Sequence, residues 1–227
     1  MKSLAFIPAR GGSKRLPGKN IKLFCGKPLI YYSIAFAQHN RISKVIVSTD
    51  DDEIAAVAAT YGAEILRRPI ELSSDEATTG AAANHCLLDQ RAKGFEPDIF
   101  VTLQPTNPLR PLELFQEALK IWDSTCDSVI SVAMNRHKFG TIEDGYYNPL
   151  NYSPGIRSQD LKLLYHENGL IYLTHPSVIE KSDIFGSKTK TLLTDEISSL
   201  IDIDTELDFE LGEHIMKIYS GKFSYLF

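Results

Sequence analysis

The stretch LAFIPARGGSKRLPGKN, residues 4–20, decides the fold of this chain. Its first four residues form a short apolar run that is typical of a buried strand, and a loop with three glycines and four cations follows. Glycines let backbone N–H groups approach a ligand closely, and clustered lysines and arginines neutralise phosphate charge. The stretch therefore predicts an α/β protein with a phosphate site directly after its first strand, the alternative being a solvated basic loop.

Two common phosphate loops do not fit this stretch. Five residues, not four, separate Gly12 from Gly18, and Asn20 stands where a Walker A loop has the hydroxyl that holds magnesium. The adjacent glycines and the Pro17-Gly18 turn also lack the spacing of a dinucleotide fingerprint. A dinucleotide-dependent oxidoreductase is therefore disfavoured, and binding of NAD(P)H would test that alternative.

Composition favours one cytoplasmic α/β domain. The chain has 227 residues, 43% of them hydrophobic, and a formal net charge of −5. No run approaches the roughly 20 apolar residues of a membrane span, so no membrane contact is expected. The acidic balance argues against general nucleic-acid binding and makes the basic loop a local site for a small phosphorylated ligand.

The first strand follows Met1-Lys2, so a cleaved signal peptide is not expected. Cys25, Cys86 and Cys126 are odd in number and far apart, which indicates reduced thiols.

Strand-like and helix-like segments alternate through the first 135 residues. Repeated βα units predict a mostly parallel sheet with helices on both faces. The loops after the strands that end near Ile7, Ser48, Leu103 and Val132 should then share one edge, where such sheets bind ligands. Strands are predicted at 45–47, 64–66, 99–103 and 128–132, and helices at 52–61, 78–93 and 111–125.

Residues 135–165 have a different texture, rich in aromatic residues, proline, asparagine and glycine. This pattern predicts hairpin excursions rather than a helix. A short apolar insertion cannot build its own core and usually packs on a partner subunit, so a homodimer is expected. The alternative is a mobile surface loop.

The C-terminal part of the chain is acidic, with eight carboxylates between Thr191 and Met216. Asp202 and Asp204 differ from the others because they alternate with apolar residues. In an extended segment both would point to one side, where they repel unless a cation lies between them. Oxygen ligands with phosphates completing the sphere describe a magnesium–nucleotide site. The alternative is a strand end leading into a helix capped by Thr205 and Asp208.

Several motifs in order resemble the nonulosonate (acylneuraminate, or CMP-sialic acid synthetase-like) cytidylyltransferases. The resemblance spans essentially the whole chain and implies a three-layer, Rossmann-like nucleotide-diphospho-sugar transferase fold. It also implies that residues 135–165 are a small β-rich dimerisation insertion that reaches the neighbouring subunit's sugar site. The motifs are Arg10-Gly11-Gly12-Ser13-Lys14 through Lys19-Asn20, Ser48-Thr49-Asp50, Arg68-Pro69 through Ser74-Asp75, the stretch from Leu103 to Arg110, Asn168 to Tyr172, and Ile201 to Asp208.

The resemblance assigns roles to individual residues. CTP would bind Ala9, Arg10, Gly11, Ser13, Lys14, Lys19, Asn20, Arg68 and Thr79. Arg10, Lys19, Asp202 and Asp204 would be catalytic, and the two aspartates would hold Mg²⁺ or Mn²⁺. The sugar would contact Gln104, Lys138, Arg157, Gln159, Asn168 and Tyr172. Arg67 competes with Arg68 for the cytosine, and Lys138 competes with Arg157 for the sugar carboxylate.

The implied reaction joins CTP to a nine-carbon, sialic-type 2-keto acid and releases pyrophosphate. Legionaminic, pseudaminic and eight-carbon Kdo-type acids are alternative acceptors within this class. A nucleotide-binding module without turnover is a rival of another class, which steady pyrophosphate release would exclude.

Overall fold

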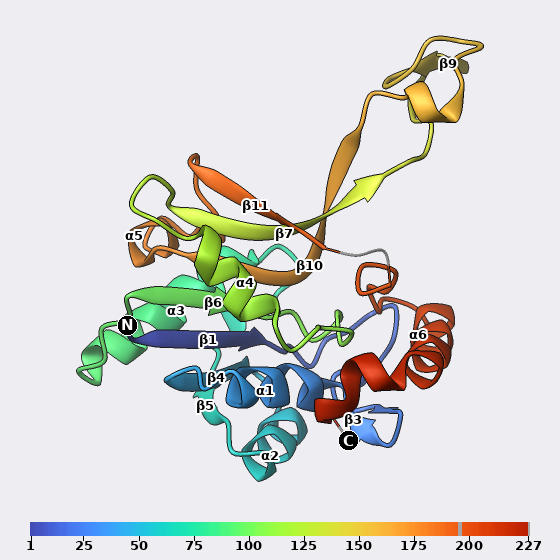
Figure 1. Cartoon of the computed structure of the whole chain (residues 1–227). Helices are drawn as coiled ribbons and strands as arrows, with labels where there is room; N and C mark the ends of the chain where they lie inside the picture. The colour runs from blue at the N-terminus through green and yellow to red at the C-terminus, as the bar shows by residue number, and fades with distance from the viewer. Residues whose placement is uncertain (195–196, 227) are drawn as a thin grey trace.

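Seven strands form the central sheet of the molecule (Figure 1). The computed structural model describes residues 1–194 and 197–226. The strands are β1 (Ser3–Pro8), β4 (Lys44–Thr49), β5 (Glu64–Arg67), β6 (Ile99–Thr102), β7 (Ser128–Asn135), β10 (Leu164–Thr174) and β11 (Thr189–Leu193). Their order is β11-β7-β10-β6-β1-β4-β5. Only β10 runs antiparallel to its neighbours in the described part of this sheet, which confirms the predicted, mostly parallel arrangement.

Helices cover both faces of this sheet, as predicted. Along β1, side chains alternate between the faces. The helices are α1 (Leu29–His39), α2 (Asp52–Thr60), α3 (Thr79–Ala92), α4 (Leu114–Ile121), α5 (Pro176–Ile179) and α6 (Glu206–Ile218), with 3₁₀ turns η1 (Ile70–Leu72), η2 (Ser158–Asp160) and η3 (Ser220–Leu226). Ala5 and Ile7 face a core that also receives apolar residues from α1, α2 and α4, while Leu4 and Phe6 face α3 and α5. None of the helices in the described residues is long and apolar enough to cross a membrane.

The helix expected over 111–125 is shorter in the structure, where α4 covers Leu114–Ile121. At its start, the Leu114 N–H donates to the carbonyl of Pro111, which makes a separate turn before the helix. At its end, the Asp123 carboxylate accepts a hydrogen bond from the backbone N–H of Thr125. This side-chain-to-backbone bond offers the chain a turn in place of a further helical turn.

A second apolar cluster attaches the C-terminal helix to the body. The small hairpin of β2 (Leu23–Phe24) and β3 (Lys27–Pro28) supplies Phe24, whose ring lies 5.4 Å from Phe209 of α6. The same ring lies 5.3 Å from Tyr32 of α1. These contacts hold the acidic segment before α6 beside the basic loop after β1.

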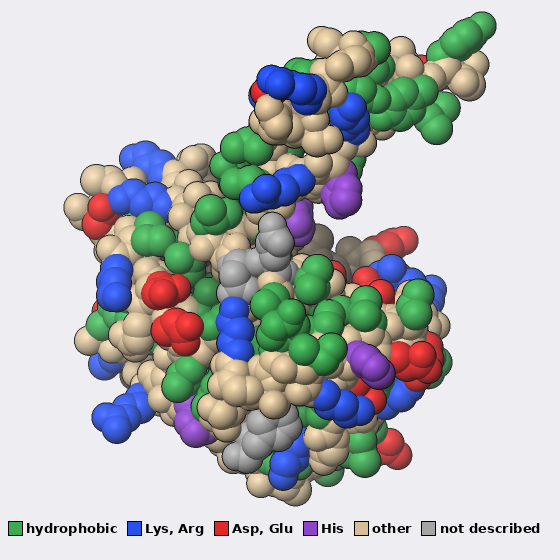
Figure 2. Space-filling model, turned by 45° about the vertical axis from the view of Figure 1, so that its right-hand side comes forward, with side chains coloured by type: hydrophobic (Ala, Val, Ile, Leu, Met, Phe, Trp, Pro, Cys, Tyr) green, Lys and Arg blue, Asp and Glu red, His purple; other side chains and the backbone are tan. Residues whose placement is uncertain are grey.

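Residues 136–163, between β7 and β10, form an arm that projects from the body (Figure 1). The arm contains the predicted hairpin, made of β8 (Gly140–Glu143) and β9 (Tyr146–Pro149). Ile142, Tyr146 and Leu150 are 75%, 76% and 66% exposed, and hydrophobic side chains gather on the arm in Figure 2. The arm therefore presents apolar surface to solvent in a single copy of the chain.

Candidate active site

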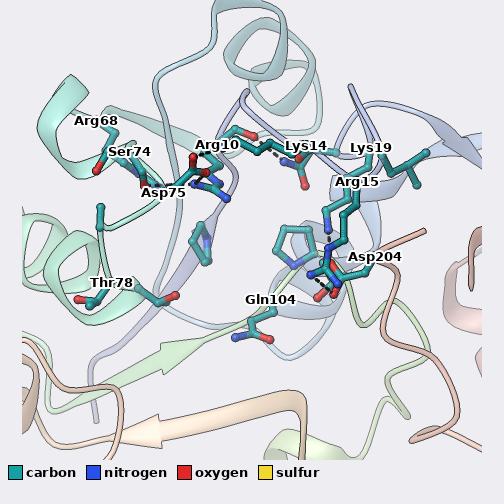
Figure 3. Close-up of a pocket in the computed structure, with 18 of the residues that line it drawn as sticks. Arg10, Lys14, Arg15, Lys19, Arg68, Ser74, Asp75, Thr78, Gln104 and Asp204 are labelled. Atoms are coloured by element: carbon teal, nitrogen blue, oxygen red, sulfur yellow. Dashed lines mark hydrogen bonds and ion pairs between the residues drawn. The ribbon is translucent and has the colours of Figure 1, made fainter. Parts of the chain in front are cut away.

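A cavity of about 570 Å³ lies at the carboxyl ends of β1 and β6 (Figure 3). Its walls come from the basic loop, the segment between β5 and α3, the loop after β6 and the segment before α6. The location agrees with the sheet edge predicted to bind a ligand. Of the predicted residues, the cavity brings together Arg10, Ser13, Lys14, Lys19, Asn20, Arg68, Thr79, Gln104, Asp202 and Asp204.

Four cations of the basic loop line this cavity, in two pairs. Arg10 and Lys14 both contact the carboxylate of Asp75, and Arg10 Nη1 also donates to the carbonyl of Ser74 at 3.1 Å. Lys19 and Arg15 both contact the carboxylate of Asp204, at 2.9 and 2.7 Å. Each pair is therefore bridged by one acid (Figure 3).

Lys19 is the most enclosed of these cations. Its side chain is 13% exposed, whereas those of Arg10, Arg15 and Lys14 are 37%, 69% and 76% exposed. Its ammonium donates to the carbonyl of Ile203 as well as to Asp204, both at 2.9 Å. A partly buried ammonium held on two sides is a fixed charge that acts in a lower dielectric than water.

Asn20 and Arg68 line the cavity from buried positions. The Asn20 amide donates to the carbonyl of Arg10 at 3.0 Å and closes the basic loop on itself. Arg68 donates to the hydroxyl and the carbonyl of Ser48 at 3.1 and 2.7 Å, and burial lowers the pKa of its guanidinium. Arg67 pairs instead with Asp52, and it is not among the described residues that line the cavity.

Asp202 and Asp204 both line the cavity. Ile201 and Ile203, which alternate with them in the sequence, are buried. Partial desolvation raises the pKa of the Asp202 carboxyl; a hydrogen bond from Thr106 opposes this effect and the charge of Asp204 adds to it. A hard cation between the carboxylates would relieve the repulsion, so the donor set fits one. No cluster of three or more His, Cys, Asp and Glu suited to a metal occurs in residues 1–194 and 197–226, so nucleotide phosphates would have to complete the coordination.

A helix cap explains locally why Asp202 and Asp204 precede α6 and are not part of it. The Thr205 hydroxyl accepts from the N–H of Asp208, while the Asp208 carboxylate accepts from the N–H of Thr205 at 2.8 Å. This reciprocal capping starts α6 at Glu206, and residues 202–204 precede it outside any helix or strand. The alternative prediction, a helix start capped by Thr205 and Asp208, is confirmed, and the metal site stays a prediction with which this cap is compatible.

Gln104 reaches the cavity because β10 makes room for it. Gly169 has φ of +69°, and a side chain there would come within 2.6 Å of Gln104 Oε1 and 2.5 Å of Asn107 Oδ1. Behind the loop, the buried Arg110 donates to the carbonyls of Gln104 and Leu170. The loop after β6 is therefore held against β10 from two sides.

The other predicted residues lie outside the described lining of the cavity. Ala9 is buried at the end of β1, and the Gly11 N–H donates to Asp50 at 3.0 Å. Asn168 is buried, with its amide donating to Thr194 at 2.6 Å. The Tyr172 hydroxyl donates to Glu167 at 3.2 Å.

Three further predicted sugar ligands lie in the arm, away from the cavity of their own chain (Figure 1). Lys138 donates to the carbonyl of Ile156 at 3.0 Å, Arg157 pairs with Asp160 at 2.8 Å, and Gln159 belongs to η2. A sugar site containing them would need the arm of another copy.

Two residues with contacts in the cavity were missed as site residues from the sequence. Asp75 belonged to a motif that carried the resemblance, but a single acid after a serine gave no sign that it would meet the basic loop. Arg15 could be distinguished from its neighbours only by its fold-dependent contact with Asp204. Asp195 and Glu196, two of the eight acids counted above, lie outside the described residues.

Comparison with known families decides the class of this protein. The model of a family described as "Cytidylyltransferase" matches residues 4–207. The chain belongs to the cytidylyltransferase family. The predicted nucleotidyltransferase activity and its use of CTP are therefore confirmed at the level of the family.

Relatives of this cytidylyltransferase act on several acids. It is 37% identical to the CMP-N,N'-diacetyllegionaminic acid synthase of Legionella pneumophila, over 96% of this chain and 97% of that protein. It is 33% identical to a pseudaminic acid cytidylyltransferase of Campylobacter jejuni, over 96% and 97%. It is 35% identical to the N-acylneuraminate cytidylyltransferase of Escherichia coli O18:K1:H7, but spans only 51% of that protein.

Solved structures agree on the fold. A CMP:2-keto-3-deoxy-manno-octonic acid synthetase complexed with CTP superposes with a TM-score of 0.68, at 18% identity, over 96% of this chain and 99% of that one. A 4-diphosphocytidyl-2C-methyl-D-erythritol synthase superposes with a TM-score of 0.69 at 12% identity, over 95% and 98%. At these identities the likeness confirms the predicted Rossmann-like α/β fold.

Proposed function

We propose that this cytidylyltransferase activates a nonulosonic, sialic-type acid by transferring CMP to it from CTP. The observation that carries the proposal is that the basic loop, Asp202 and Asp204 line one and the same cavity. Four cations suit a triphosphate, and a pair of carboxylates suits its metal. The names of the relatives support an acceptor of the nonulosonic class.

The nucleotide would lie along the basic loop. Arg10, Lys14 and Lys19 would bind the triphosphate, with Ser13 and Asn20 beside them. Arg68 and Thr79, which line the same cavity, would face the cytosine. Ala9 and Gly11 would contribute only through the backbone next to Arg10.

The reaction would be an in-line displacement. The anomeric hydroxyl of the sugar attacks the α-phosphorus and loses its proton to water, while the bond from the α-phosphorus to the bridging oxygen breaks and pyrophosphate leaves. Lys19 is the fixed positive charge best placed to offset the charge that develops at the α-phosphate. Because little covalent work falls to the protein, positioning and charge neutralisation supply the rate.

Asp202 and Asp204 would hold Mg²⁺, or Mn²⁺, together with phosphate oxygens. The ion when bound would neutralise charge on the triphosphate and polarise the reacting oxygens. Before the ion binds, Arg15 and Lys19 neutralise Asp204. These two cations therefore reduce the repulsion between the two carboxylates and an anionic nucleotide.

The sugar would lie on the Gln104 side of the cavity. Asn168 and Tyr172 would act there mainly by supporting β10, which packs on Gln104 through Gly169. Lys138, Arg157 and Gln159 would come from the arm of a second subunit in a homodimer, and one of the two cations would face the sugar carboxylate. The apolar surface of the arm supports this assembly. We expect the enzyme to work in the cytoplasm.

A panel of acceptors tests the proposal. Purified protein with CTP and Mg²⁺ is offered N-acetylneuraminic, N,N'-diacetyllegionaminic, pseudaminic and Kdo acids, and pyrophosphate release is measured. We expect steady release with at least one nine-carbon acid. The legionaminic acid synthase of Legionella pneumophila, which is 37% identical over 97% of its length, favours N,N'-diacetyllegionaminic acid as the candidate after N-acetylneuraminic acid. CTP binding without release for any acid would instead indicate a nucleotide-binding module.

A further inference from the structure

Asp75 bridges two cations inside the nucleotide cavity (Figure 3). Its Oδ1 lies 3.2 Å from Arg10 Nη1, and its other carboxylate oxygen contacts Lys14 Nζ. The hydrogen bond from Lys14, followed by the attraction of both cations, lowers the pKa of the Asp75 carboxyl, so the group is ionised at neutral pH. A carboxylate in this position offers the two cations the same kind of oxygen ligand as a phosphate group.

The contacts of Asp75 are suited to being exchanged. The side chains of Asp75 and Lys14 are 50% and 76% exposed. Ion pairs with this much solvent contact contribute little to stability. A phosphate carries more charge and more acceptor oxygens than a carboxylate, so it competes well for the same cations.

We propose that Asp75 is an internal counter-ion of Arg10 and Lys14, which a phosphate of CTP displaces and which returns to the cations as pyrophosphate leaves. The inference rests on the proposed binding of the triphosphate by these two cations. It makes Asp75 a residue that sets affinity for polyphosphates without taking part in the chemical step.

Displacement has a consequence for the wall of the cavity. Arg10 Nη1 donates to the carbonyl of Ser74 as well as to Asp75. The segment between β5 and α3, which also carries Leu72 and Thr78 in the lining, is thus tied to the basic loop through the same cations. Binding of a phosphate to Arg10 and Lys14 frees Asp75 in the wall nearest to them.

The affinity change follows from charge. With Asp75 in place, two cations and one carboxylate leave a net charge of +1; without it the net charge is +2. Removing the carboxylate therefore strengthens the attraction for an anion and spares it the breaking of two ion pairs. Because exposed pairs are weak, the gain should be about 3- to 10-fold in affinity.

Calorimetric titration of the intact protein with CTP and with inorganic pyrophosphate tests this, at constant Mg²⁺ and low ionic strength. We expect Asp75→Asn and Asp75→Ala each to bind both ligands about 3- to 10-fold more tightly than the wild type. The gain should shrink in about 0.5 M KCl, because screening weakens exposed charges. Glu96→Gln is the matched control, since Glu96 pairs with Arg91 outside the described lining of the cavity, and it should leave both affinities unchanged.

One further variant separates this inference from the proposed nucleotide site. If Arg10→Ala does not weaken CTP binding, the proposed site is wrong. If Arg10→Ala weakens it but neither Asp75 variant binds CTP or pyrophosphate more tightly, Asp75 orients the cations instead, and the counter-ion role is overturned. A gain that does not respond to salt overturns it as well. Thermal melting confirms that each variant is folded.

Discussion

At the scale of single residues, enclosure distinguishes Lys19 from the other cations of its loop. We expect Lys19→Ala to lower turnover about 100-fold or more at saturating CTP, because a preorganised charge near the reacting phosphate is lost. Pyrophosphate release measures this effect. Lys22→Ala is the control, since Lys22 pairs with Glu206 outside the described lining of the cavity and its loss should leave turnover within about 2-fold. Turnover close to wild type in a folded Lys19→Ala protein would remove Lys19 from the catalytic residues.

The proposed role of Asp202 and Asp204 predicts that activity depends on a divalent metal ion. We expect activity to disappear in EDTA and to return with Mg²⁺ or Mn²⁺. Asp202→Asn and Asp204→Asn should each raise the Mg²⁺ concentration for half-maximal activity by about 10-fold or more, because a neutral amide is a poor ligand for a hard cation. Glu210→Gln, an exposed position on α6, should not change it. Full activity in EDTA would contradict the metal assignment.

At the scale of elements, we expect the arm to form the contact between the two subunits of a homodimer. We expect Ile142→Asp combined with Tyr146→Asp to convert a dimer into a monomer, because charges on an apolar contact surface oppose its burial. The monomer should still bind CTP and should transfer CMP poorly. Light scattering and pyrophosphate release measure the two effects. Leu88→Asp, which alters an exposed apolar residue of α3, is the control and should stay dimeric. A monomeric, fully active wild type would exclude this role for the arm.

Local sequence signals predict individual helices and strands better than they predict how the strands pair. The capping residues Thr205 and Asp208 and the change of composition at residue 135 are local, and the structure has a helix start and an arm at these places. The start of β10 does not follow from local signals, because the strand begins at Leu164, inside the stretch 135–165 whose composition predicts hairpin excursions. β10 lies between β6 and β7 and runs antiparallel to both. This pairing joins strands that are distant in the sequence, and the local pattern of apolar residues does not specify it.

At the scale of the whole molecule, Arg110 joins three parts of the chain. It is fully buried, and its guanidinium donates to Ser33 of α1, to the carbonyl of Gln104 and to the carbonyl of Leu170 in β10. Burial lowers the pKa of Arg110 to about 10, which still leaves it charged at neutral pH. Acceptors left unpaired in the interior are costly.

We therefore expect Arg110→Met to lower the free energy of unfolding by about 3 kcal/mol or more. Urea denaturation followed by circular dichroism measures the change. Arg91→Met provides the comparison, because Arg91 makes solvent-accessible pairs with Glu96 and Glu180, and its loss should cost less than about 1 kcal/mol. Equal losses in the two variants would show that burial of Arg110 adds nothing to stability.

The sequence predicts the two charged segments of the site, one basic and one acidic, but not the ion pairs between them. Basic residues near the N-terminus and acids near residue 200 implied a polyphosphate and its metal. That Asp204 would meet Arg15 and Lys19 depends on the packing of Phe24 against Phe209, which brings chain ends more than 180 residues apart together. Such contacts follow from the complete fold and not from any short motif.

The way the arm joins the sheet has an evolutionary consequence. The arm leaves at the end of β7 and returns at the start of β10, and these strands pair with each other, Asn135 opposite Leu164. Its two ends therefore meet at one fixed point, and residues between them can be replaced or lengthened without moving the strands that carry the nucleotide cavity. If acceptor recognition rests on the partner's arm as proposed, lineages can exchange one acid for another by rewriting this segment alone. The chemistry of CTP would then be inherited unchanged while the sugar it decorates diversifies.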